Sequence, residues 1–149
     1  MHIVEQSIID RPASKVWPFI IAPEYFQLWN TKIISLEAKG QFLLNQPFMT
    51  RYRMNGKEMQ CISTVTAIEN ERLLEIQHTN CVSKEDNSQL IVCERITIKE
   101  SAHGTIVTKD VEVKHHQVPW ILIPLIWFTM KFGKRVESDK LKQMCETNP

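Results

Sequence analysis

The sequence lacks an excess of charge of either sign. Its 149 residues include 18 basic and 17 acidic side chains, which gives a formal net charge of +1. A protein that is steered to nucleic acid or to an anionic surface by its overall field carries a clear positive excess. The composition therefore predicts that nucleic acid is not a partner.

Targeting and membrane-spanning segments are also missing. The opening MHIVEQSIID has no basic segment followed by an apolar run, so we expect no secretory leader and a cytoplasmic protein. The apolar residues 120–132 are too few to span a bilayer, and Pro124 interrupts them. Transient contact of this segment with a membrane surface stays open as an alternative to a half-buried helix.

Side chains for metal binding or covalent catalysis are not grouped in the sequence. The four cysteines have no C-x-x-C pair, which argues against a zinc knuckle or a thioredoxin-like site and favours free, mostly buried thiols. No histidine has a nearby Ser or Cys and a third orienting group, as a nucleophilic triad requires. We therefore predict no metal and no cofactor. The cysteines are Cys61, Cys81, Cys93 and Cys145.

The chain opens with a strand and two short helices. Residues 3–9 are rich in β-branched side chains and end at Asp10-Arg11-Pro12, which predicts a strand closed by a turn. Pro12 and Pro23 mark helix starts, because a proline in the first turn loses no hydrogen bond. The predicted helices are residues 13–20 and 24–28.

Strands with a period of two follow from residue 32. Asn55-Gly56 predicts a two-residue hairpin turn, which sets Tyr52 opposite Met59 and Arg53 opposite Glu58. One face of this hairpin is then mostly apolar and the other charged. Residues 73–78 form another predicted strand, and residues 80–88 a polar loop. Because each strand is expected to pair with its neighbour in sequence, we predict a largely antiparallel meander.

A second hairpin, turning near residues 102–104, places two charges in an apolar row. Its register sets Lys109 opposite Ile96 and diagonal to Glu94. Buried unpaired charges are costly, so the two either pair with each other or one of them meets a ligand. A twist that leaves them at the rim in water is the other alternative. A carboxyl in an apolar cavity would have a raised pKa and could transfer protons.

The last segment predicts a helix from Pro124 at the latest to about Glu146, a rod of about 35 Å at 1.5 Å per residue. Its first half is apolar on nearly all sides and must be covered from more than one direction. Together with the strands, it predicts an α+β fold in which a curved antiparallel sheet wraps a long C-terminal helix.

The order of parts resembles the START and polyketide cyclase superfamily, which has the helix-grip fold. The resemblance covers residues 3–146 and is carried by residues 9–17, by Pro23-Glu24 leading to Trp29-Asn30, by Gly104-Thr105 and by residues 141–146. It implies one domain with about seven antiparallel strands, and a ligand cavity between the sheet, the long helix and the two short helices. Members bind sterols, lipids, polyketides, hormones or quinones, and some catalyse cyclisation or dehydration, so the fold does not fix the activity.

The leading hypothesis is a protein that binds a hydrophobic or amphipathic small molecule. An inward row of aromatic and methionine side chains suits such a ligand, although the same side chains can simply fill the core. The candidate ligand-binding residues are Phe26, Trp29, Phe48, Tyr52, Met59, Glu94, Lys109, Trp127 and Phe128.

Two alternatives come from other classes of protein. One is an enzyme that resembles the polyketide cyclases and moves a proton with Glu94 or His78. His78 ends a predicted strand and, in the simpler interpretation, is a surface histidine, as are His115 and His116. The other is a stress or partner-binding module that docks through residues 120–132. The ligand, the oligomeric state and the pathway are not predicted.

Overall fold

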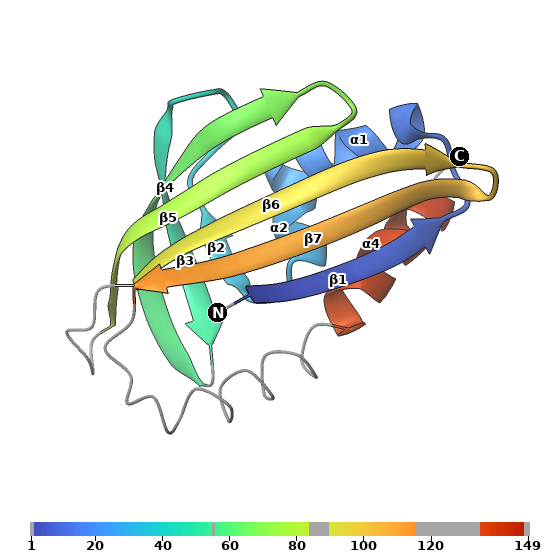
Figure 1. Cartoon of the computed structure of the whole chain (residues 1–149). Helices are drawn as coiled ribbons and strands as arrows, with labels where there is room; N and C mark the ends of the chain where they lie inside the picture. The colour runs from blue at the N-terminus through green and yellow to red at the C-terminus, as the bar shows by residue number, and fades with distance from the viewer. Residues whose placement is uncertain (1, 55, 84–89, 116–134, 148–149) are drawn as a thin grey trace.

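A computed structural model describes residues 2–54, 56–83, 90–115 and 135–147. Seven antiparallel strands form one curved sheet in the order β1-β7-β6-β5-β4-β3-β2, and the helices α1, α2 and α4 lie on one side of it (Figure 1). This is the α+β architecture that the sequence predicts. The strands are β1 (His2–Ile9), β2 (Ile33–Leu36), β3 (Pro47–Met54), β4 (Lys57–Glu69), β5 (Leu73–Ser83), β6 (Leu90–Ser101) and β7 (Gly104–His115).

The two short helices follow β1, as predicted. Helix α1 spans Ala13–Ile21 and begins after Pro12, and α2 spans Pro23–Trp29 with its proline in the first turn. Proline fits there because its missing N–H has no intrahelical acceptor to lose. Trp17, Phe26 and Trp29 are buried in the main core, so this aromatic-rich pair of helices supplies large side chains to it.

Both predicted hairpin registers are confirmed. In the first hairpin Tyr52 pairs with Met59 and Arg53 with Glu58, and in the last Lys109 pairs with Ile96. Arg51 and Arg53 bind Glu58 on the exposed face. Because side chains alternate along each strand, one face of the sheet is exposed to solvent and the other face lies against the helices.

Strand β5 is longer than the sequence predicts. The expected polar loop 80–88 was wrong at its start, because β5 continues to Ser83; residues 84–89 lie outside the described ranges. The register shifts between His78 and Cys81, and Asn80 has a positive φ of 50° there. A bulge of this kind lets the strand continue while exchanging which residues face inward.

Helix α4 covers Arg135–Thr147 and packs against β1, α1 and α2. Leu141 and Cys145 are buried, while the Glu146 carboxylate accepts a hydrogen bond from the Asp10 backbone at 3.0 Å. The first half of the predicted long helix lies outside the described residues. Within the described ranges, no helix is long and apolar enough to cross a membrane.

Candidate functional site

A row of buried polar side chains crosses the inner face of the sheet. Five successive strands contribute one side chain each, and two of these side chains link the others. His78 bonds to Tyr52, Ser63 and Glu94, and Glu94 bonds to Lys109. The row is widened by Thr50, whose hydroxyl lies 2.8 Å from the Ser63 hydroxyl. Buried polar groups are tolerated when their hydrogen bonds are satisfied, so this bonded row is an ordered part of the interior. Its members are Tyr52 (β3), Ser63 (β4), His78 (β5), Glu94 (β6) and Lys109 (β7).

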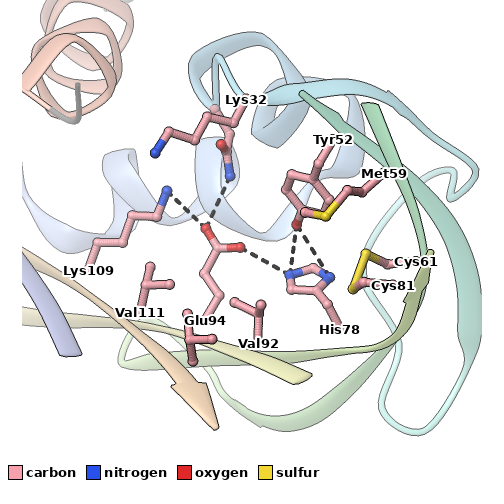
Figure 2. A pocket seen from close by; sticks show the side chains of 12 residues that line it. Lys32, Tyr52, Met59, Cys61, His78, Cys81, Val92, Glu94, Lys109 and Val111 are labelled. Carbon is pink, nitrogen blue, oxygen red and sulfur yellow. Dashed lines mark hydrogen bonds and ion pairs between the residues drawn. A yellow bond between two sulfur atoms is a disulfide. The ribbon is translucent and has the colours of Figure 1, made fainter. Parts of the chain in front are cut away.

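Glu94 is the centre of the row. Its Oε1 lies 2.9 Å from the Lys109 ammonium and accepts a hydrogen bond from the Asn30 amide at 3.1 Å. Its Oε2 lies 3.2 Å from Nε2 of His78. Both carboxylate oxygens are thus satisfied within the protein, which is what a charge with only 4% exposure requires (Figure 2).

The electrostatics of Glu94 differ from those expected for a carboxyl in an apolar cavity. Burial raises the pKa of this carboxyl, but the positive charge of Lys109 and the hydrogen bond to His78 outweigh burial and lower its pKa well below the ordinary value of 4.5. Glu94 is therefore ionised at neutral pH. An ionised carboxylate cannot donate a proton, so Glu94 is excluded as a general acid in this state.

His78 is buried with 2% exposure, so its interpretation as a surface histidine was wrong. Its Nδ1 lies 2.6 Å from the Ser63 hydroxyl, and its Nε2 lies 2.7 Å from the Tyr52 hydroxyl. Because ionised Glu94 only accepts, a hydrogen on Nε2 satisfies Glu94, and Nδ1 then accepts from Ser63. The imidazole is held between fixed partners on both sides.

The polar row forms one side of a pocket. About 520 Å³ between the lining side chains is free of protein atoms, part of it open to solvent, and about 50 Å³ can take the centre of a water molecule. The other side of the pocket is apolar. The lining residues are Asn30, Lys32, Tyr52, Met59, Cys61, His78, Cys81, Val92, Glu94, Lys109, Val111 and Val113.

Two cysteines in the pocket wall form a disulfide, which corrects the prediction of four free thiols. Cys61 and Cys81 are joined across β4 and β5 with their Cα atoms 4.1 Å apart. The bulge at Asn80 turns Cys81 to the same face as His78, which places it against Cys61. Cys93 and Cys145 are free thiols, and burial raises the pKa of Cys145 to about 12.

The predicted site residues fall into three groups. Tyr52, Met59, Glu94 and Lys109 line the pocket together, and His78 joins them. Phe26 and Trp29 are buried in the core and Phe48 packs against it, outside the pocket lining, so a ligand contact for these three stays a prediction. Trp127 and Phe128 lie outside the described residues. Among the described residues, no group of three or more His, Cys, Asp and Glu side chains is placed to hold a metal ion.

Sequence reasoning missed several lining residues. Asn30 closes the end of α2 and Lys32 lies in the turn before β2, where periodicity says nothing about direction. His78 had a usable signal, because Leu74, Ile76 and His78 alternate and all three are buried. Cys81 had little signal, because the bulge breaks that alternation.

No protein-family model and no curated protein matches the chain. Solved structures match it over nearly its whole length. MLL2253 from Mesorhizobium loti has a TM-score of 0.74 and 15% identity, with 100% of this chain and 99% of that chain covered. Ara h 8.0201 has a TM-score of 0.67 and 13% identity, covering 99% of each chain. DynU16, from the dynemicin biosynthetic locus, has a TM-score of 0.65 and 17% identity over 98% of this chain and 47% of that one.

At these identities the likeness shows the fold alone. The helix-grip architecture predicted from the sequence is confirmed, because the chain, with its seven-stranded antiparallel sheet, matches these structures over 99% or more of its length. Membership of the START and polyketide cyclase superfamily stays a prediction. Function has to be argued from the pocket itself.

Proposed function

We propose that this protein binds an amphipathic small molecule in the pocket between the sheet and the helices. The observation that carries the proposal is the divided lining of the pocket. Val92, Val111 and Val113 offer an apolar wall, while Tyr52 and Lys109 belong to the polar row. Small-molecule sites typically combine a mostly apolar surface with a few placed polar groups.

The open space in the pocket is small. Pockets for small molecules span about 300–1,000 Å³, whereas the open volume here is about 50 Å³, so a ligand of that class needs side chains of the pocket wall to move aside. Met59 at the wall has a flexible thioether side chain that adapts to irregular shapes.

Ligand binding is tested with a pocket-filling substitution. Val111→Trp places a large side chain in the pocket, whereas Val4→Trp adds the same group where Val4 is 58% exposed. Binding of anilinonaphthalene sulfonate, and any copurified molecule seen by native mass spectrometry, should be lost in Val111→Trp and kept in Val4→Trp. Circular dichroism checks folding. Equal binding by both variants, or no binding by the wild type, contradicts the proposal.

A second candidate function is proton transfer next to a carbonyl, as in a polyketide cyclase. The specific observation in its favour is the Tyr52 hydroxyl, 2.7 Å from Nε2 of a buried histidine that lies 3.2 Å from Glu94. With the hydrogen on Nε2 facing ionised Glu94, the lone pair of His78 is on Nδ1, so His78 accepts the proton through the Ser63 hydroxyl, and Tyr52 is the group that donates one. In this mechanism Glu94 orients and stabilises the imidazole.

The enzyme and the carrier are distinguished by proton exchange. The α-protons of 2-tetralone exchange in D2O, and proton magnetic resonance follows the loss of their signal. An enzyme should accelerate the exchange, and Tyr52→Phe and His78→Gln should each reduce that acceleration by about 10²-fold or more while binding persists. Exchange at the buffer rate in the wild-type protein contradicts proton transfer from this substrate class and leaves the carrier function standing.

A further inference from the structure

We propose that the Cys61–Cys81 disulfide is a redox-active site that a small dithiol reaches through the pocket, and that its reduction weakens ligand binding there. This inference rests on the proposed binding function and adds the regulation of the same site. It is carried by the position of the disulfide, since both of its cysteines line the pocket.

The disulfide borders open space at the pocket. Cys61 and Cys81 are each 1% exposed and belong to the main hydrophobic core. Both also line the pocket, and Figure 2 shows the bonded sulfur atoms beside His78. Because thiol–disulfide exchange requires a thiolate to reach one of the sulfur atoms, the pocket is the route by which a reductant arrives.

The disulfide also lies at an irregular point of the pocket wall. The register of β4 with β5 shifts between Gln60 and Ile62, which sets Cys61 opposite both Asn80 and Cys81. Asn80 takes up the extra residue with its positive φ of 50°. Ladder hydrogen bonding is disrupted at a bulge, so the disulfide ties the two strands together where their pairing is interrupted.

The reaction with a dithiol is a balanced two-electron exchange. One thiolate of the dithiol attacks a sulfur atom of the disulfide, which breaks the Cys61–Cys81 bond and forms a mixed disulfide. The second thiol attacks the mixed disulfide and closes the dithiol into a cyclic disulfide. The two electrons lost by the dithiol reduce both cysteine sulfurs, and its two thiol protons end on them.

Reduction makes this part of the wall bulkier. A covalent bond holds two sulfur atoms well inside their contact distance, whereas two separate thiols stay about 3.5 Å or more apart. Away from the pocket both cysteines are packed in the core, and a close-packed interior does not yield readily. The thiols therefore move into the pocket, whose open volume is only about 50 Å³. A ligand that shares this space binds more weakly to the reduced protein.

Ligand and reductant consequently oppose each other. When a ligand binds the oxidised protein more tightly than the reduced protein by some factor, it makes reduction less favourable by the same factor. A bound ligand also occupies the route to the sulfur atoms, so it slows the exchange.

The first test measures the binding of anilinonaphthalene sulfonate in two redox states. Fluorescence titration gives its dissociation constant for the wild type before and after treatment with dithiothreitol, and circular dichroism checks that the reduced protein is folded. We expect reduction to weaken binding about tenfold, which is a usual size for such couplings. Cys61→Ala/Cys81→Ala, whose wall holds no sulfur at these positions, should bind at least as tightly as the oxidised wild type and be unaffected by dithiothreitol. Cys93→Ala, which removes a free thiol, is the matched control and should keep the full response.

The second test follows the disulfide itself. The protein is incubated in mixtures of reduced and oxidised dithiothreitol and quenched with iodoacetamide, and mass spectrometry counts the two further alkyl groups that reduction allows. Saturating anilinonaphthalene sulfonate should slow the reduction and raise the ratio of reduced to oxidised dithiothreitol at the midpoint about tenfold. In Val111→Trp, which fills the pocket, the dye should have neither effect.

The outcomes separate this inference from the function on which it rests. If the oxidised wild type does not bind the dye, the proposed function and the inference both fail. If the two redox states bind it equally, binding stands and the inference is overturned, as it is if the folded protein resists dithiothreitol or if the reduced protein is unfolded. Reduction at the same rate with and without the dye overturns the route through the pocket. If Cys61→Ala/Cys81→Ala binds as weakly as the reduced wild type, the loss comes from the missing bond between the strands, which overturns the entry of thiols into the pocket.

Discussion

Glu94 and Lys109 form an ion pair on the inner face of the sheet, with 2.9 Å between carboxylate and ammonium and less than 9% exposure for either residue. The two residues lie on neighbouring strands in diagonal register, with Lys109 opposite Ile96. Desolvation of the two charges is costly, so the pair persists only because Asn30 and His78 complete the bonding of the carboxylate.

Breaking this pair from one side should destabilise the fold strongly. Lys109→Met leaves a buried carboxylate without its ammonium partner, and we expect a loss of about 3–5 kcal/mol in the free energy of unfolding. The double variant Glu94→Gln with Lys109→Met should lose less than the sum of the two single variants, because neither charge is then left alone. Urea denaturation measures all three. Arg51→Met, at the exposed pair with Glu58, is the control and should change little. Strict additivity in the cycle would contradict the pairing.

Acid should weaken the wild-type protein through Glu94. Its pKa is lowered in the folded state, so the unfolded chain takes up the proton first as the pH falls below about 4.5. Stability from this group is therefore present above that pH and is lost progressively below it, with a slope of up to about 1.4 kcal/mol per pH unit. Urea denaturation between pH 3 and 7 should show a steeper loss in the wild type than in the Glu94→Gln/Lys109→Met double variant. Parallel curves would show that Glu94 has an ordinary pKa in the folded protein.

The pair could be predicted from the sequence because a hairpin turn fixes a register. Gly104 and the alternation of Ile96, Ile98, Val107 and Val111 set the strands against each other, and parity then decides which face each side chain takes. The same logic gave the first hairpin, from Asn55-Gly56. Turn type and side-chain alternation therefore suffice to predict the register where strands are regular.

The rest of the site depends on departures from regularity. The bulge at Asn80 reverses parity, so the approach of Cys81 to Cys61 follows from tertiary structure and not from spacing. Lys32 belongs to a turn, and its direction is set by the start of β2. His78 is the intermediate case. Alternation along its strand predicts that its side chain faces inward, but its buried partners Ser63 and Tyr52 come from other strands.

The disulfide should contribute to stability in a way that reductant reveals. Cys61 and Cys81 are 20 residues apart in sequence, and a closed loop of that length stabilises by about 3 kcal/mol in the chain-entropy description. We expect dithiothreitol to lower the free energy of unfolding of the wild type by about that amount and to leave Cys61→Ala/Cys81→Ala unaffected. Cys93→Ala, which removes a free thiol, should keep the full response to reductant. A wild-type protein indifferent to reductant would show that the two thiols are not bonded.

Gly104 lies where the last hairpin packs closely against the end of β1, and its substitution tests whether that close approach can relax. Its φ is +121°, and a Cβ at this position would lie 2.2 Å from the carbonyl oxygen of Ile9. Gly104→Ala should therefore cost about 3 kcal/mol or more, since it combines an unfavourable backbone conformation with a clash against backbone. Gly40→Ala has a positive φ of 78° but open space, so it should cost about 1–2 kcal/mol. Thermal and urea unfolding compare the two variants, and the difference between them measures the steric part. Equal costs would mean that β1 can move away from the hairpin, and that the pairing of β1 with β7 at this end of the sheet is looser than these contacts require.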